Sequence, residues 1–203
     1  ATSRPAGGAA TVLDLLLAQY GVAREGLARA ALAAGEAGIP GLTAEVERAA
    51  LALDTPAARL IIRGDERPLR LDAVETLMAS QTMVVDACRN VVRSADTIVS
   101  LATRPVLFAL ARALAEAWPG DVPRDVLLAR AFRAKHGDES HRARLRVEMG
   151  RLRAALRTLA DVAATKRGFA LAPRATGDIV VLAPLVEERH APVLALLADG
   201  ESW

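Results

Sequence analysis

The spacing of apolar residues predicts helices over most of the first 80 positions. An apolar segment over 11–20 is expected to form a short helix that stops at Gly21. A second helix is expected over 23–38, and a third after Thr43, which is a good N-cap. Only about one such helical pair is visible, so this TPR-like region must pack on another part of the protein or belong to a longer array.

The period of the pattern changes after this region. Residues 58–64 are a candidate strand, and 69–80 are expected to form a helix. Over 83–102, short apolar stretches are interrupted at 89–90 and 95–96. This pattern is typical of short antiparallel strands joined by tight turns.

From residue 104 the helical period of 3.6 returns. Helices are expected over 104–118 and 122–132, each with a proline near its first turn. A third, basic helix is expected over 140–159, with Ser140 as its N-cap. Two or three short strands follow over 162–184. The predicted fold class is therefore α+β and mostly helical, with a helical N-terminal region followed by a unit that contains short antiparallel strands.

The basic helix has two different faces. Its large apolar residues recur at spacings of four, three, four and three, which predicts a buried stripe made of Leu145, Met149, Leu152, Leu156 and Leu159. The opposite face holds Ser140, Arg144, Val147, Arg151 and Ala154, flanked by His141 and Glu148. A helix buried along one edge, with arginines on the other, has the shape of an element that enters the DNA major groove.

Charge is distributed unevenly along the chain. The net charge is +2, but residues 104–175 hold 15 lysines and arginines against 7 aspartates and glutamates, a net charge of +8. The segments on either side are acidic. An alanine- and arginine-rich composition from a GC-rich genome explains the number of arginines but not this segregation. The basic block therefore points to a localised anionic partner.

Several kinds of chemistry are not expected. Cys88 is the only cysteine, so neither an internal disulfide nor a cysteine-based zinc site can form. Its place among strand residues suggests a small core filler. The chain has no P-loop, no G-x-G-x-x-G and no G-x-S-x-G motif, and Asp14, Asp86 and Asp96 are interpreted as surface or turn residues. We therefore expect no enzyme activity, no cofactor and no metal.

Neither a membrane span nor a signal peptide is apparent. Apolar runs fall short of about 18 residues, and the start lacks a basic segment leading into an apolar one. The expectation is a cytoplasmic protein without a membrane partner.

Residues 83–183 resemble the DNA-binding domain of the OmpR/PhoB-type winged-helix family. Residues 83–105 look like the short N-terminal sheet of that family. The segment VEMGRLRAAL resembles its recognition-helix pattern, with an Arg-Leu-Arg step at 151–153. The segment ATKRGFAL resembles its wing, a turn formed by Thr165, Arg167 and Gly168 before an aromatic Phe169.

This resemblance implies sequence-specific binding of double-stranded DNA by a bacterial transcriptional regulator. The recognition helix would lie in the major groove and the wing on the backbone. The residues expected to face bases are Arg144, Val147, Glu148 and Arg151. Those expected to contact the DNA backbone are Ser140, His141, Arg142, Arg146, Arg153, Arg124, Lys166 and Arg167. No phosphoacceptor receiver domain precedes the unit, so control by aspartyl phosphorylation is not implied. The loop over 134–143 also differs from the usual loop of the family.

The expected organisation has four parts. Residues 1–9 form a flexible leader, 10–82 a helical region, 83–186 the winged-helix domain, and 187–203 a C-terminal helix. That helix resembles the start of a further, truncated domain, which suggests a middle fragment of a larger regulator. A homodimer partner and RNA polymerase are candidate partners besides DNA. The alternative function is a protein–protein interaction or scaffold module built on a winged-helix fold.

Overall fold

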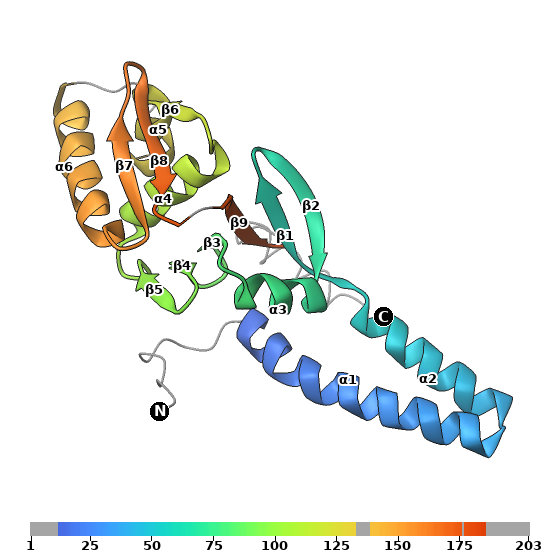
Figure 1. The fold of residues 1–203 in the computed structure, drawn as a ribbon. Coiled ribbons are helices and arrows are strands. Elements are labelled where there is room, and N and C mark those ends of the chain that lie inside the picture. Colours follow the sequence, from blue (N-terminus) through green and yellow to red (C-terminus); the bar gives the residue numbers. More distant parts are fainter. Residues whose placement is uncertain (1–11, 133–138, 176, 186–203) are drawn as a thin grey trace, which may run out of the picture.

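The computed structural model describes residues 12–132, 139–175 and 177–185. Within these ranges the chain forms six helices and nine strands in a mixed α and β arrangement (Figure 1). The leader expected over 1–9 and the C-terminal helix expected over 187–203 lie outside the described residues. None of the described helices is long and apolar enough to cross a membrane.

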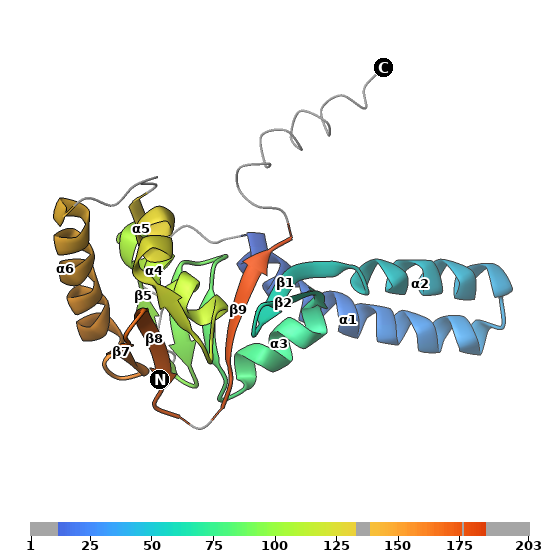
Figure 2. The same cartoon turned by 90° about the horizontal axis from the view of Figure 1, so that it is seen from above.

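The first two helices form a hairpin that extends away from the rest of the molecule (Figures 1 and 2). Helix α1 runs from Val12 to Ala37, and α2 from Pro40 to Leu53. The break expected at Gly21 is wrong, because α1 continues through it. A single glycine costs a helix only about 1 kcal/mol relative to alanine, too little to end one that is otherwise favoured.

The turn between these helices also differs from expectation. Gly38 ends α1 with φ +64°, a backbone conformation that favours glycine. Helix α2 then begins at Pro40, and its N-cap is Ile39, which makes no side-chain cap bond. The N-cap role expected for Thr43 is therefore wrong, since Thr43 lies inside α2. The proline at the first helical position sets the start earlier.

A six-stranded sheet lies between this hairpin and the second half of the chain. Its order is β2-β1-β9-β3-β4-β5. The strands are β1 (Pro56–Ile62), β2 (Asp65–Arg70), β3 (Met83–Asp86), β4 (Val91–Ser94), β5 (Thr97–Ser100) and β9 (Ile179–Pro184). The antiparallel strands predicted over 83–102 are confirmed by the pairing of β3 with β4 and of β4 with β5.

Strand β9 joins distant parts of the chain. It pairs antiparallel with β1 and parallel with β3. All of its residues from Ile179 to Ala183 are buried, as expected for a central strand covered on both faces. The boundary expected between residues 82 and 83 therefore runs through one continuous sheet.

Two apolar cores cover the two faces of this sheet. Helix α3 (Leu71–Ala79) packs on one face, where Val74 belongs to the same apolar cluster as Val180 and Leu182 from β9. The other face belongs to the larger core with helix α4 (Pro105–Glu116), to which β9 contributes Val181 and Ala183. The alternation along β9 follows from successive side chains pointing to opposite faces of a sheet.

The turn between β3 and β4 is held by the one buried charged residue of the described chain, Asp86, which is the last residue of β3. Its Oδ1 accepts bonds from the backbone N–H groups of Cys88 (2.9 Å) and Arg89 (3.2 Å), and its Oδ2 lies 2.7 Å from Nη1 of Arg89. The assignment of Asp86 as a surface or turn residue is therefore wrong: Asp86 is the buried last residue of β3, and its carboxylate holds the turn that follows. Cys88 lies in this turn rather than in a strand, half-buried against the smaller core.

The second half of the chain is a helical unit closed by a second sheet. It contains α4, β6 (Asp121–Pro123), α5 (Arg124–Phe132), α6 (Glu139–Leu156), β7 (Ala160–Ala164) and β8 (Gly168–Pro173). The strands form a three-stranded antiparallel sheet of order β6-β8-β7. Helices α4, α5 and α6 contact one another pairwise, and α6 leads into the β7–β8 hairpin (Figure 1).

Candidate nucleic-acid interface

Helix α6 is held by the apolar stripe that its sequence predicts. Leu145, Met149, Leu152 and Leu156 are each at most 2% exposed and belong to the larger core. Leu159 is also buried, but it lies beyond the helix, which ends at Leu156. The N-cap role expected for Ser140 is wrong, because the helix already includes Glu139. The buried edge leaves the opposite face of α6 open.

The open face carries three of the four residues expected to contact bases. Arg144, Val147 and Arg151 are exposed, and Val147 is 53% accessible. The guanidinium carbon of Arg144 lies 4.6 Å from the ring centre of Phe132, the last residue of α5. This cation–π contact restrains Arg144 without neutralising its charge.

Glu148, the fourth of these residues, lies differently. Its side chain is only 13% exposed, and its Oε1 lies 2.8 Å from Nη1 of Arg151. The two residues line a small pocket together with residues 104–107 at the start of α4. Glu148 is therefore turned inward beside α4, while its partner Arg151 stays 64% exposed.

The residues at the N-terminal end of α6 form exposed ion pairs. Arg142 and Arg146 both contact Glu139, at 3.7 Å and 3.0 Å, and all three side chains are more than 60% exposed. Ser140 is exposed and His141 is half-buried. Exposed pairs of this kind contribute about 0–1 kcal/mol. Arg142 and Arg146 can therefore leave the Glu139 carboxylate and bind another anion at a small cost in free energy.

Arg153 has a different role in the fold. Its Nε and Nη2 both donate to the carbonyl oxygen of Val162, at 2.9 Å and 2.6 Å. The side chain thus ties the last turn of α6 to strand β7. This contact fixes the direction in which the β7–β8 hairpin leaves the helix.

The turn of the β7–β8 hairpin is built by Thr165 and Gly168. The Thr165 hydroxyl donates to Oδ2 of Asp121 (2.6 Å) and accepts from the N–H of Gly168 (2.8 Å). A Cβ on Gly168 would lie 1.7 Å from the carbonyl oxygen of Val122, so only glycine fits where β8 crosses β6. Local contacts thereby explain the threonine and the glycine of the Thr-Lys-Arg-Gly sequence.

Arg124 holds this turn by hydrogen bonds to its backbone. Its two terminal nitrogens donate to the carbonyl oxygens of Lys166 and Thr165, both at 3.1 Å, and its guanidinium lies over the ring of Phe169. Lys166 and Arg167 stand exposed at the tip, and within the described part of the chain their side chains make no ion pair. The hairpin therefore presents two positive charges on a restrained backbone.

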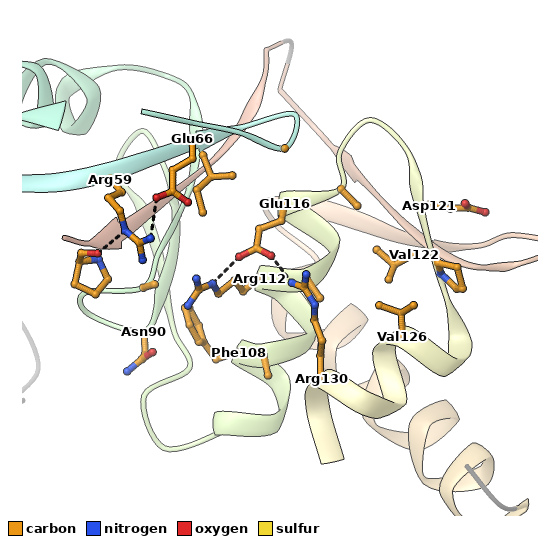
Figure 3. A pocket seen from close by; sticks show the side chains of 18 residues that line it. Arg59, Glu66, Asn90, Phe108, Arg112, Glu116, Asp121, Val122, Val126 and Arg130 are labelled. Carbon is orange, nitrogen blue, oxygen red and sulfur yellow. Dashed lines mark hydrogen bonds and ion pairs between the residues drawn. The ribbon is translucent and has the colours of Figure 1, made fainter. Parts of the chain in front are cut away.

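A larger cleft lies elsewhere, between the six-stranded sheet and helices α4 and α5, with a volume of about 1180 Å³ (Figure 3). Its charged side chains face one another. Arg59 on β1 lies 2.7 Å from Glu66 on β2 and donates to the Pro184 carbonyl, while Glu116 points between Arg112 (2.7 Å) and Arg130. Positive and negative groups thus offset each other within the cleft, in contrast to the open face of α6.

Sequence reasoning missed two residues that shape this interface, Phe132 and Asp121. The signal for Phe132 was weak, since one aromatic residue at the end of an apolar helix usually indicates core packing. Asp121 follows a Pro-Gly pair and looks like a turn residue, so its bond to Thr165, 44 positions away, is visible only in the fold. Among the described residues, no group of three or more His, Cys, Asp or Glu side chains could hold a metal ion.

Comparison of the chain with protein-family models, with curated proteins and with solved structures gives no match.

Proposed function

We propose that residues 83–183 act as a winged helix-turn-helix of the OmpR/PhoB type that binds double-stranded DNA as a bacterial transcriptional regulator. The observation that carries the proposal is the open face of α6. This helix holds five arginines against two glutamates and presents Arg144 and Arg151 opposite a fully buried stripe. A rigid helix with exposed arginines matches the dimensions and the donor and acceptor groups of the major groove.

The order of elements supports the same function. A short sheet precedes three packed helices, and the third helix leads into a hairpin whose turn carries Lys166 and Arg167. With α6 in the major groove, this hairpin would reach the adjacent backbone. Arg142 and Arg146 would leave Glu139 for phosphates. Arg124 and Arg153, which hold backbone carbonyls, would act mainly by fixing the hairpin.

The first experiment is selection of binding sites from random duplex DNA, followed by fluorescence anisotropy of the selected duplex across a salt series. Four exposed cations, Arg142, Arg146, Lys166 and Arg167, are placed to meet phosphates, so log K against log[salt] should have a slope of about −3.5. Arg151→Ala should cost about 1–3 kcal/mol and relax sequence preference, whereas Lys166→Ala should weaken all duplexes alike.

The matched control is Arg48→Ala, which removes an equal charge from an exposed site on α2. It should leave affinity within about twofold of wild type, since α2 lies at the far end of the molecule (Figure 1). Equal binding by Arg151→Ala, Lys166→Ala and wild type would contradict the proposal.

A second candidate function, protein–protein interaction, is favoured by the α1–α2 hairpin. Three large apolar residues are mostly exposed there: Val22 (72%), Leu32 (70%) and Leu51 (66%). Exposed apolar residues that gather on one element can mark a site of protein–protein contact. Salt dependence separates the two functions. Association through such an apolar surface should change little with salt, whereas DNA binding should weaken steeply.

A further inference from the structure

Glu148 differs from the other acidic residue of α6 in its surroundings. The side chain of Glu139 is 73% exposed, whereas that of Glu148 is 13% exposed. Glu148 nevertheless lies in the middle of α6, three residues before Arg151. Along the helix it falls between Val147 and Arg151, two of the residues expected to face bases. A half-buried carboxylate that faces inward is poorly placed to contact DNA itself.

The surroundings of Glu148 fix its direction. It lines a pocket of about 420 Å³ with Arg104, Pro105, Val106 and Leu107, which form the start of α4. The positive end of a helix dipole favours a carboxylate there. From this position Glu148 holds Nη1 of Arg151 at 2.8 Å, and the rest of that guanidinium extends outward.

Building on the proposed function, we infer that Glu148 is a positioning residue that contacts no base itself and aims Arg151 at a base edge. Reading guanine requires two parallel hydrogen bonds from one guanidinium plane. An unrestrained arginine loses its rotamer freedom when it forms them, whereas one held by Glu148 has already lost part of that freedom. Glu148 therefore improves discrimination between sequences.

The ion pair has a second effect, on charge. Because Glu148 and Arg151 together are neutral, Arg151 adds little attraction for phosphates in general. Removing the charge of Glu148 should then act in opposite directions on two quantities. Affinity for any duplex should rise, and the preference for the selected sequence should fall.

The test compares Glu148→Gln with the matched control Glu139→Gln, which removes the same charge from the same helix without touching Arg151. Binding of the selected duplex and of a scrambled duplex is measured by anisotropy across the salt series. Both variants should steepen the salt slope by about one phosphate contact. Only Glu148→Gln should lower the ratio of selected to scrambled affinity, by about tenfold.

Two further variants separate positioning from a purely structural role. In the Glu148→Gln, Arg151→Ala double variant, discrimination should be no lower than in Arg151→Ala alone, because the two residues act as one unit. Glu148→Asp, which keeps the carboxylate, should discriminate better than Glu148→Gln. A global loss of packing would instead lower the unfolding midpoint and add to the effect of Arg151→Ala, which would overturn the inference.

The outcomes for the two proposals are distinct. If wild type shows no salt-dependent DNA binding, the proposed function fails and the inference fails with it. If wild type discriminates between duplexes and Glu148→Gln discriminates equally well, the inference alone is overturned. An equal loss of discrimination in Glu139→Gln would also overturn it, since charge alone would then explain the effect.

Discussion

Replacement of Gly168 by alanine tests the account of the β7–β8 hairpin most directly. The added Cβ would lie 1.7 Å from the carbonyl oxygen of Val122, 2.7 Å from its carbonyl carbon and 3.0 Å from Cα of Pro123. All three are backbone atoms, so no side chain can rotate out of the way. Strands β6 and β8 would have to separate by about 1.3 Å to reach the 3.0 Å below which such contacts are essentially never found.

The cost can be estimated from the contacts that this movement breaks. Overpacking of a closely packed site costs about 1–3 kcal/mol. The two hydrogen bonds between Gly168 and Thr165, at 2.8 Å and 3.0 Å, add about 1 kcal/mol each if they are lost. The free energy of unfolding should therefore fall by about 3–5 kcal/mol, measured by urea denaturation followed by far-UV circular dichroism.

Gly150 provides a matched control of opposite sign. It lies within α6, and a Cβ there would meet no atom within 4 Å. Gly150→Ala should therefore stabilise the protein by up to about 1 kcal/mol through the difference in helix propensity. A Gly168→Ala variant as stable as wild type would refute the close approach of β8 to β6, whatever the behaviour of Gly150→Ala.

Three other substitutions test separate contacts. Arg124→Ala should remove the clamp on the hairpin turn and destabilise by about 1–2 kcal/mol in urea denaturation, and Arg124→Lys should not restore this, because lysine has no planar fork to reach two carbonyls. Asp86→Ala should lower the free energy of unfolding by about 3 kcal/mol. A double-mutant cycle with Arg89→Ala should give a coupling energy of at least about 0.5 kcal/mol, and additive effects of the two substitutions would contradict the ion pair. Phe132→Leu should weaken DNA binding two- to fivefold through loss of the ring under Arg144, with an unchanged salt slope because no charge is altered.

Much of the fold from residue 83 onward could be predicted from the sequence because its determinants are local. The stripe from Leu145 to Leu156 follows from a period of 3.6, and the β3–β4–β5 strands follow from short apolar stretches with turns between them. The helix boundaries were less predictable. Gly21 and Thr43 suggest boundaries by local preference, but one glycine costs too little to end α1, and the proline at the first position of α2 sets its start before Thr43.

The direction of individual charged side chains could be predicted only in part. A helical wheel places Glu148 on the flank of the open face, and an angle of this kind does not say what occupies the neighbouring space. That space is a small pocket lined by the start of α4, some 40 residues earlier in the chain, so the inward direction of Glu148 depends on tertiary packing. Arg144 was placed correctly on the exposed face, and its partner Phe132 comes from a different helix.

The central position of β9 has a consequence for synthesis of the protein. Its partner strand β1 ends at Ile62, whereas β9 begins at Ile179, so 116 residues separate their ends. At about 5–20 residues per second, a ribosome needs about 6–23 s to produce that interval. During this interval, the edge of β1 that later pairs with β9 has unpaired backbone N–H and C=O groups. These groups lie next to Leu60 and Ile61, which are buried in the folded protein. A nascent chain therefore carries an exposed strand edge until its last strand emerges, and a chaperone that binds extended apolar segments should contact residues 56–62 during this time.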